Sequence, residues 1–326
     1  MKTKIVYVLV SSDNDIYFEQ LLVSVYSLKY YNPDAFVVVL VDNNTFETLN
    51  GYRKVLYEYI NEIKVIDTPQ NYSPKERSRE IKTSIRKHIN GDFLYLDTDT
   101  IICDNIKEVD DIKNNISIVL DFHVPFREYP FRKYIIEIMD NIFNIDVNNV
   151  EDYYNSGIML IKDTKIAYDF FNAWNKNWRY SAFHKNNSQD QPALMKTNYD
   201  FKNVVRNLDG IYNCQIAASI KYLHNGKILH FFNSTFFNDT KYTPFFTKDF
   251  YLNIRNNRGF TDDYKNCILN CKSSFEPFTT PIGHDEFIFL TSLFGKRIFK
   301  QFIKKGFIYN LFNIILKVIN RINSFI

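Results

Sequence analysis

Asp97 and Asp99, two acidic residues with one residue between them, directly follow the apolar run 93–96 of this 326-residue chain. An uninterrupted apolar run is typical of a strand that is buried on both faces. In open α/β sheets, ligands bind beyond the carboxyl ends of such strands. Carboxylate oxygens suit Mg²⁺ and Mn²⁺, which in turn bind phosphate oxygens. An isolated Asp-x-Asp pair is usually a solvated turn, so the preceding strand is what favours a metal site.

A histidine far along the chain could complete such a site. His230 lies near the end of the apolar run 228–232. A histidine in this setting is more often a core residue. It becomes a candidate third metal ligand because it follows both the acidic pair and a polar Asp-Gln segment.

Two polar segments between these positions could contact a ligand. Residues 153–157 lead into an apolar strand, and their small Ser-Gly pair would let a ligand come close to the backbone. Residues 188–194 open a helix, with Asp190 or Gln191 near its positive N-terminal end. Basic residues on an expected helix at 78–90 could reach the same phosphates, although a solvated basic face is an equal alternative.

Apolar runs and helical periodicity alternate along the first two thirds of the chain. This strand–helix alternation predicts an α/β sheet with parallel pairing and right-handed crossovers. Residues 236–289 show no clear pattern, and residues 294–326 have a helical pattern. The expected strands are 5–10, 36–41, 63–66, 93–96, 116–120, 153–161 and 228–232, and the expected helices are 17–30, 45–60, 78–90, 131–145 and 164–178.

Charge is unevenly distributed. The whole chain carries a net charge of +3, but residues 287–326 contain seven basic and no acidic residues, so the remainder carries −4. An acidic body without a known nucleic-acid motif disfavours nucleic acid as a partner. The basic residues of the tail alternate with large apolar ones from 294 to 326, which predicts amphipathic helices lying on anionic lipid. Packing on the rest of the chain or on a dimer partner is the alternative.

The cysteine pattern and the apolar runs bear on location. Four scattered cysteines do not make a disulfide framework, and Cys267-x3-Cys271 has no second pair beside it for zinc. Free thiols therefore predict a cytoplasmic protein. The apolar run near the N-terminus is too short for a signal peptide, and none approaches the roughly 20 residues of a membrane span. Together with the tail, this predicts a peripheral protein on the inner face of a membrane.

These segments, taken in order, resemble the family 8 glycosyltransferases over about residues 4–235. Residues 95–99 match the family's Tyr-Leu-Asp-x-Asp strand, and residues 154–157 resemble its Phe-Asn-(Ala/Ser)-Gly segment. The turn at 13–15 resembles its base- and ribose-binding loop, residues 188–194 resemble its Asp-Gln-Asp segment, and His230 falls at its last metal ligand. Each match alone is weak, but five in this order are fairly specific.

The resemblance implies a fold and a domain organisation. It predicts an α/β, Rossmann-like GT-A fold of nucleotide-diphospho-sugar transferases, with a mainly parallel central sheet and a C-terminal helical extension. The catalytic domain would span 1–235. An irregular segment at 236–286 would complete or cover it, and 287–326 would form a basic amphipathic helical tail.

The resemblance also implies a role for each matching residue. Asp97, Asp99 and His230 would hold Mn²⁺ or Mg²⁺ against the diphosphate of a UDP-sugar. Gln191, together with Asp190, would be catalytic and lie beneath the anomeric carbon. Family members retain the anomeric configuration. The residues that would bind the nucleotide sugar are Ser11, Asp13, Asn14, Arg79, Lys82, Asp97, Thr98, Asn155, Ser156 and Asp190.

The chain departs from the family pattern at two places. Pro192 stands where the family has the second acidic residue of Asp-Gln-Asp. Residues 231–234 replace a segment with Gly and Lys-Pro-Trp, whose lysine normally assists the leaving diphosphate. Lys227 or Lys241 could substitute for it.

The sequence thus predicts a metal-dependent retaining glycosyltransferase that moves a hexose from a UDP-sugar to a glycan or lipid-linked saccharide. Surface polysaccharide synthesis, for example of lipopolysaccharide, is the expected setting. One alternative is a catalytically inactive sugar-nucleotide-binding module at a membrane surface. A sugar-phosphate nucleotidyltransferase is less favoured, because residues 11–15 lack the glycines and basic residues that such an enzyme would need after its first strand.

Overall fold

The structure is a computed structural model that describes residues 1–219, 221–232, 243–273, 289–290, 292–304, 307, 310–311 and 314–315. The chain divides into two compact units, Met1–Thr279 and Thr280–Ile326. The division falls neither at 235 nor at 286, the two boundaries expected from the sequence.

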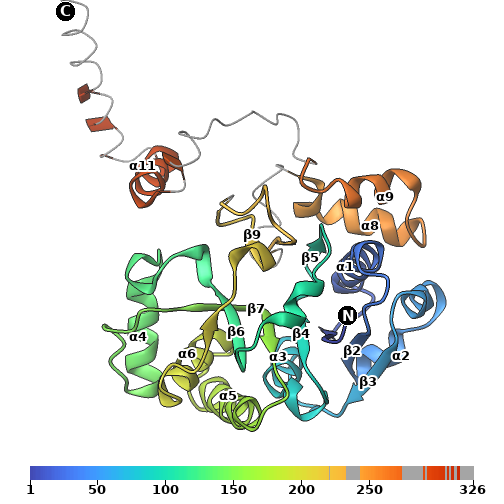
Figure 1. Ribbon diagram of the computed structural model, residues 1–326, viewed down its shortest axis with the longest axis horizontal. Coiled ribbons are helices and arrows are strands. Elements are labelled where there is room, and N and C mark those ends of the chain that lie inside the picture. Colours follow the sequence, from blue (N-terminus) through green and yellow to red (C-terminus); the bar gives the residue numbers. More distant parts are fainter. Residues whose placement is uncertain are drawn as a thin grey trace, which may run out of the picture. The chain divides into compact units, whose positions relative to one another are not determined.

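A seven-stranded sheet forms the centre of the first unit (Figure 1). Its strand order is β3-β2-β1-β4-β7-β6-β8, and β7 alone among these strands runs against its neighbours. The sheet is therefore mainly parallel, as expected. Its strands are β1 (Lys4–Leu9), β2 (Val37–Asp42), β3 (Glu62–Ile66), β4 (Phe93–Leu96), β6 (Ile116–Leu120), β7 (Tyr154–Ile161) and β8 (Arg206–Asn207).

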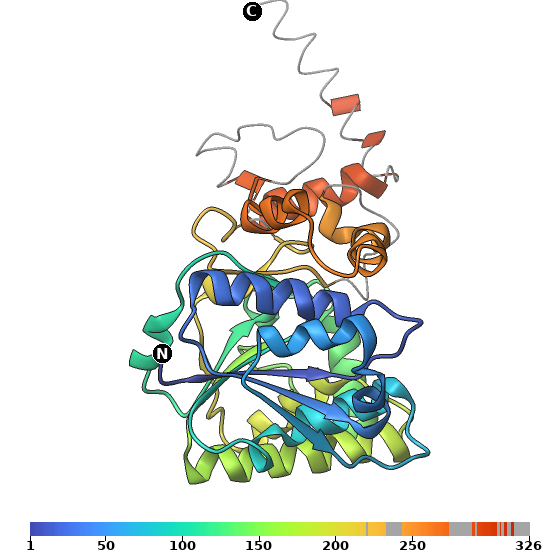
Figure 2. The same ribbon diagram turned by 90° about the vertical axis from the view of Figure 1, so that its right-hand side faces the viewer.

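The central strands are mainly apolar because both faces of the sheet are covered (Figure 2). In β1, Ile5, Tyr7 and Leu9 pack in the core cluster that contains α1, whereas Val6 and Val8 pack in the cluster that contains α5. Burial of a large apolar side chain contributes roughly 1.5–3 kcal/mol, so this two-sided core holds the carboxyl edge of the sheet firmly.

Helices lie on both faces of the sheet. Three of them differ from the sequence expectation. The helix expected at 164–178 continues to His184. The helix expected at 45–60 is short and gives way to a 3₁₀ segment from Gly51, whose φ is +54°. The helix expected at 78–90 begins four residues earlier, where Ser73 and Glu76 form a capping box and Pro74 occupies the first turn. The helices are α1 (Tyr17–Tyr31), α2 (Asn43–Thr48), α3 (Pro74–Ser84), α4 (Arg132–Phe143), α5 (Lys165–His184) and α6 (Asp190–Asp200).

A second, three-stranded sheet brings distant segments together. Strand β10 (Ile228–His230) lies between β5 (Thr100–Ile102), to which it is antiparallel, and β9 (Cys214–Gln215), to which it is parallel. His230 pairs with Thr100 in this register. This small sheet therefore places the end of β10 beside the residues that follow β4.

The segment expected to be irregular from 236 to 286 contains two helices. They are α8 (Lys248–Asn256) and α9 (Asp262–Leu269), so the expectation of irregular structure is wrong over these residues. Both helices pack against α1, and Phe250, Ile254 and Ile268 are buried in the same core cluster as that helix. Residues 248–269 therefore form part of the first unit.

The second unit contains α11 (Leu293–Lys304) among its described residues. Phe294 and Phe299 are more than half exposed. The predicted break at Gly306 lies outside the described residues. No helix in the described part of the chain is both long and apolar enough to cross a bilayer.

Cys103, Cys214 and Cys271 are free thiols. Cys103, which follows β5, and Cys271, which follows α9, lie with their Sγ atoms 3.2 Å apart.

Candidate active site

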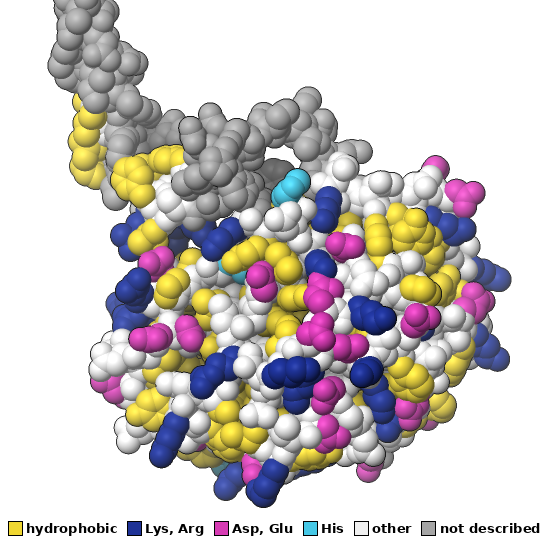
Figure 3. Space-filling view, in the orientation of Figure 1, with side chains coloured by type: hydrophobic (Ala, Val, Ile, Leu, Met, Phe, Trp, Pro, Cys, Tyr) yellow, Lys and Arg dark blue, Asp and Glu magenta, His cyan; other side chains and the backbone are white. Residues whose placement is uncertain are grey.

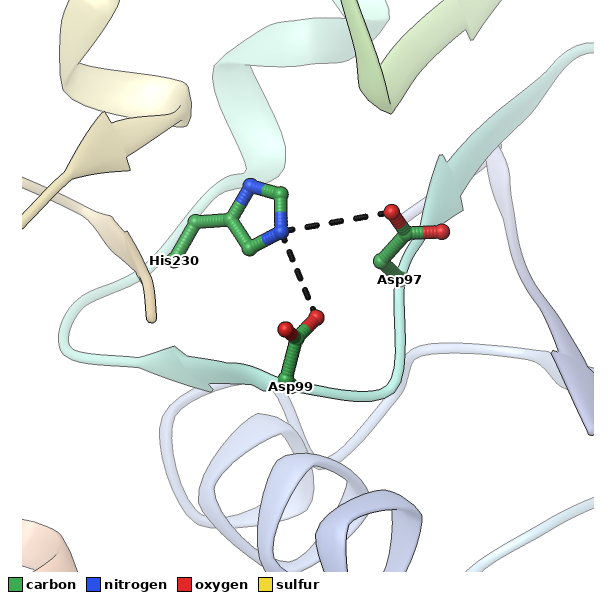
Figure 4. Close-up of side chains that lie close together, drawn as sticks. All are labelled: Asp97, Asp99 and His230. Atoms are coloured by element: carbon green, nitrogen blue, oxygen red, sulfur yellow. Dashed lines mark ion pairs between the residues drawn. The ribbon is translucent and has the colours of Figure 1, made fainter. Parts of the chain in front are cut away.

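Two carboxylates and an imidazole converge beyond the carboxyl end of β4 (Figure 4). Asp97 directly follows β4, Asp99 precedes β5, and His230 ends β10. The Nε2 atom of His230 lies 3.3 Å from Oδ1 of Asp99 and 3.9 Å from Oδ2 of Asp97. One ligand atom from each residue lies within 4.8 Å of the others. The three candidate metal ligands are thus brought together from segments 130 residues apart.

The donor set suits a divalent cation. In an octahedral Mg²⁺ site with bonds of about 2.1 Å, adjacent ligand atoms lie about 3 Å apart. The 3.3 Å and 3.9 Å separations at His230 need only a small closing movement to reach this spacing. Two hard carboxylates and one imidazole match Mg²⁺ and Mn²⁺. The residues present therefore fit the metal that the sequence predicts.

Gly157 makes room for this cluster. A Cβ atom at this position would lie 2.2 Å from Cε1 of His230 and 2.9 Å from Oδ2 of Asp97. The sequence led us to expect that the Ser-Gly pair admits a ligand to the backbone. The structure instead fills the space above Gly157 with the two candidate metal ligands.

The pairing of β7 with β6 is irregular, and neighbouring side chains of β7 contact different parts of the site as a result. Between two paired positions β6 advances two residues, from Ile118 to Leu120, while β7 advances five, from Tyr154 to Met159. As a result Tyr154 and Met159 pack in the same core cluster, although strict alternation would separate them. Within this stretch, Asn155 donates to Asp121 and Ser156 donates to Asp190, so the two side chains serve different contacts.

Helix α3 contributes two cations to the other side of the site. Lys82, which is almost fully buried, lies with Nζ 3.1 Å from Oδ1 of Asp97 and 3.4 Å from Oδ2 of Asp190. Nε of Arg79 lies 3.0 Å from Oδ1 of Asp190. Ser156 donates to Oδ2 of Asp190 at 2.8 Å. Arg79, Lys82, Ser156 and Asp190 thus form one buried charged group beside Asp97.

The charges of this group shift the pKa values of its members. Burial opposes ionisation of Asp190, but Arg79 and Lys82 outweigh it and hold the pKa of that carboxyl well below its usual range. The carboxylate of Asp190 in turn raises the pKa of Arg79. Burial, followed by the charge of Asp97, raises the pKa of Tyr95, whose hydroxyl donates to that carboxylate. Acidic side chains gather near the middle of the face shown in Figure 3, with basic ones beside them.

Gln191 lies on the first turn of α6, close to β7. Its Nε2 donates to Oδ2 of Asp121 at 3.1 Å and to the carbonyl oxygen of Tyr154 at 3.0 Å. Asp121, just after β6, is buried, and burial raises its pKa despite hydrogen bonds from Asn155, Tyr129 and Gln191. The candidate catalytic amide is therefore held by a buried carboxylate.

The loop after β1 is ordered by hydrogen bonds to one acidic side chain. Ser11 Oγ and Ser12 N both donate to Asp15 at 2.7 Å. Asp13 and Asn14, the residues expected to contact uridine, are exposed at the tip. Their contact with a nucleoside stays a prediction. Thr98 lies half-buried between the two candidate metal-binding aspartates.

Tyr17, at the start of α1, lies near this loop and near Asp99. Burial raises the pKa of its hydroxyl, as do the carboxylates of Asp15 and Asp99, whereas Arg79 lowers it. Its ring is nonetheless 42% exposed, so it offers an aromatic surface between the loop and the metal cluster. The sequence analysis missed this residue. An aromatic directly after the 13–15 turn was the available signal.

Of the two lysines that the sequence offers for the leaving diphosphate, Lys227 lies among the described residues. Nζ of Lys227 binds Glu108 and the carbonyl oxygen of Asn105, so this lysine is committed elsewhere. Lys241 lies outside the described residues. The prediction that Lys227 substitutes for the family's lysine is therefore disfavoured.

Other residues that complete the site have no motif of their own. Asp121 and Asn213 hold Asn155 and His230, and neither was singled out from the sequence. Arg53 and Arg255 bind carbonyl oxygens of the loop after β1 and were missed as well.

No protein-family model matches the sequence, and no curated protein matches it either. Solved structures do match. An active-site variant of LgtC superposes with a TM-score of 0.53 at 17% identity, covering 81% of this chain and 99% of that one. The galactosyltransferase LgtC in complex with donor and acceptor sugar analogs gives 0.48 at 18% identity, over 86% and 98% of the two chains. Mouse xyloside xylosyltransferase 1 in its apo form gives 0.47 at 12% identity, over 72% and 99%.

At such low identity, the likeness to the LgtC variant is a likeness of fold. It agrees with the mixed, mainly parallel sheet of the first unit. The chain therefore has the α/β GT-A fold, the fold of the glycosyltransferase LgtC.

Proposed function

We propose that this chain is a retaining glycosyltransferase of the family 8 type, which uses Mn²⁺ or Mg²⁺ to transfer a hexose from a UDP-sugar to a glycan or glycolipid acceptor. The observation that carries the proposal is the convergence of Asp97, Asp99 and His230 beyond β4, on a GT-A fold. The resemblance of the motifs around these residues supports the family and the donor.

The site has groups for each requirement of sugar transfer. A bound divalent cation would stabilise negative charge on the departing diphosphate. Asp190 holds Arg79 and Lys82 in place, and we propose that these cations and Asn155 bind the donor. Gln191 Oε1 would face the positive charge that develops at the anomeric carbon. Asp13, Asn14 and the exposed ring of Tyr17 would contact the nucleoside.

Hydrolysis of UDP-sugars without acceptor tests this proposal. We expect slow, Mn²⁺-dependent release of UDP from one sugar of a panel. Asp97→Asn and Asp99→Asn should each lower the rate by about 100-fold or more, because each removes a charged metal ligand. Asp169→Asn is the matched control, since this aspartate lies on α5 and pairs with Lys165 outside the site.

The same assay distinguishes the alternatives. Mn²⁺-dependent UDP binding without hydrolysis of any sugar would indicate an inactive binding module, the alternative that the commitment of Lys227 to Glu108 favours. Formation of a UDP-sugar from UTP and a sugar 1-phosphate would indicate a nucleotidyltransferase. Absence of both UDP binding and hydrolysis would show that the acidic pair is structural.

We further propose that the second unit binds an anionic membrane surface from the cytoplasmic side, where a lipid-linked saccharide would be the acceptor. Basic residues alternate with exposed Phe294 and Phe299 along α11. Each basic residue near an anionic leaflet contributes about 1 kcal/mol to binding. The basic residues of this helix are Lys296, Arg297, Lys300 and Lys304.

A further inference from the structure

A buried carboxylate connects the candidate metal ligands to the candidate catalytic amide. Asp121 is 4% exposed. Its Oδ1 accepts a hydrogen bond from Nδ2 of Asn155 at 3.0 Å. Its Oδ2 accepts from the hydroxyl of Tyr129 at 2.8 Å and from Nε2 of Gln191 at 3.1 Å. All three partners are donors, so this carboxylate acts only as an acceptor, as an ionised one must.

The donor and acceptor roles in these hydrogen bonds determine which nitrogen of His230 carries its proton. Asn155 turns its Nδ2 to Asp121, and its Oδ1 accepts from Nδ2 of Asn213 and from the backbone N–H of Gly157, each at 3.0 Å. Asn213, which is fully buried, then presents Oδ1 to Nδ1 of His230 at 3.0 Å. Because a carboxamide oxygen cannot donate, the imidazole must carry its proton on Nδ1. Nε2, which faces the two aspartates, keeps the lone pair that binds a metal.

The same carboxylate sets the orientation of Gln191. Both N–H groups of this side chain are used, one by Asp121 and one by the carbonyl oxygen of Tyr154. Oε1 accepts no hydrogen bond from any residue that the structure describes. A carboxamide rotated by 180° would lose both contacts and place an oxygen against the carboxylate. The acceptor-only carboxylate therefore leaves the oxygen of Gln191, not its nitrogen, available to a ligand.

We propose that Asp121 is a positioning residue that fixes the tautomer of His230 through Asn155 and Asn213, and the orientation of the Gln191 amide by direct contact. Two backbone groups favour the same orientations: the N–H of Gly157 donates to Oδ1 of Asn155 at 3.0 Å, and the carbonyl oxygen of Tyr154 accepts from Gln191. Asp121 acts together with them, and among the described residues its carboxylate is the one side chain that contacts both amides. The part that concerns Gln191 rests on the proposed function. The part that concerns His230 does not.

Asp121→Asn is the informative substitution because it preserves shape and places one donor where there was none. The carboxamide has one oxygen, so it cannot accept hydrogen bonds from both Asn155 and Gln191 as the two carboxylate oxygens do. Either the Asn155–Asn213 path must reverse, which moves the His230 proton to Nε2, or Gln191 must turn its oxygen inward. We therefore expect the variant to lose metal affinity, catalytic rate, or both, by about 10- to 100-fold, the range found for residues that orient metal ligands.

Two measurements separate these effects. NMR of ¹⁵N-histidine-labelled, metal-free protein at about pH 8 distinguishes Nδ1–H from Nε2–H. The histidine signal that is missing from the spectrum of the His230→Gln variant belongs to His230. Wild type should show Nδ1–H at His230. Titration of the full chain with Mn²⁺ gives the affinity, and hydrolysis at saturating Mn²⁺ reports on Gln191.

Two further variants complete the test. Asn213→Ala interrupts only the path to His230, so it should weaken Mn²⁺ binding while lowering hydrolysis at saturating Mn²⁺ less than Asp121→Asn does. It also carries the test if Asp121→Asn fails to fold. Asp42→Asn is the matched control: this carboxylate is equally buried and binds Thr45 and Arg77 outside the path. It should leave the His230 tautomer and the Mn²⁺ affinity unchanged.

Certain results would overturn the proposal. An Nε2–H tautomer in wild type, or an Asp121→Asn protein with unchanged tautomer, Mn²⁺ affinity and hydrolysis, would each do so. These results are distinct from failure of the proposed function, in which wild type would bind Mn²⁺ and hold the Nδ1–H tautomer yet hydrolyse no UDP-sugar.

Discussion

At the scale of single residues, Asp190 is the carboxylate on which the basic side of the site depends. It is buried, and it binds Arg79, Lys82 and Ser156. Removal of one partner from a buried charge pair typically costs about 3–5 kcal/mol, because the other charge remains without compensation. The stability of the folded chain should therefore depend on this one charge.

The pH dependence of stability tests this point. The folded-state pKa of Asp190 is depressed, so its stabilising effect is fully present above the unfolded value of about 3.9 and is lost as pH falls below it. Asp190→Asn should lower the free energy of unfolding at pH 7, and the difference from wild type should shrink below about pH 4. Urea denaturation across pH 3–7 measures both. A constant difference over this range would contradict the assignment.

The sequence indicated the residues that have a motif and missed those that only support them. Asp97, Asp99 and His230 could be found because each ends an apolar run, and their convergence is confirmed. Asp121 and Asn213 have no spacing relation to them. They meet the site only because β6 and β9 lie beside β7 and β10, and this adjacency is a property of the folded sheets.

At the scale of elements, α8 supports the loop after β1. The guanidinium of Arg255 donates to the carbonyl oxygens of Asp13 and Asp15 and pairs with Glu19, which is fully buried. A helix near the C-terminal side of the first unit thus fixes a loop near its N-terminus. Residues 248–256 therefore support the loop after β1, although they lie far from it in the sequence.

Arg255→Ala should weaken both stability and UDP binding, for separable reasons. It leaves Glu19 buried without its cation, and it frees the loop that carries Asp13. Adding Glu19→Gln removes the uncompensated charge, so the double variant should regain most of the lost stability. It should not regain UDP affinity, because the carbonyl contacts remain absent. Thermal unfolding and UDP titration give the two values. Recovery of both together would show that the loop does not depend on Arg255.

Helix boundaries were less predictable than strands. Buried strands are continuous apolar runs, so β1, β2, β4 and β6 lie close to where the sequence placed them. The sequence contains a signal for the early start of α3, the capping box at Ser73, but an analysis of apolar periodicity does not detect it. Helices α8 and α9 were missed because each is short, with nine and eight residues, and buries few positions: Phe250, Tyr251 and Ile254 in α8, and Ile268 in α9.

At the scale of the whole molecule, the candidate site belongs to the first unit. Its described residues, including Arg255 on α8, all precede the division at Thr279. The GT-A fold was predictable from motif order, whereas this boundary was not. It depends on α8 and α9 packing against α1, which composition alone does not reveal.

Truncation after Thr279 separates the two proposed activities. The shortened chain should keep Mn²⁺-dependent UDP binding within about threefold, since a few tenths of a kcal/mol is the usual coupling between distant independent sites. It should lose binding to vesicles that contain anionic lipid, because the seven basic residues of 287–326 are removed. Co-sedimentation with anionic and neutral vesicles measures this. Unchanged vesicle binding would exclude the tail as the membrane anchor and leave packing or dimerisation as its role.

The irregular pairing of β7 has an evolutionary consequence. This strand has three residues more than its partner between paired positions, an odd number, which reverses the faces of its first residues. Loss of a single residue there would restore the opposite alternation and exchange Asn155 with Ser156, so that each would meet the wrong half of the site. The length of this stretch is therefore constrained, as is Gly157, where a Cβ atom would collide with His230. We expect related proteins that keep the activity to keep this spacing. Related proteins that lose the spacing should keep the fold but not the activity.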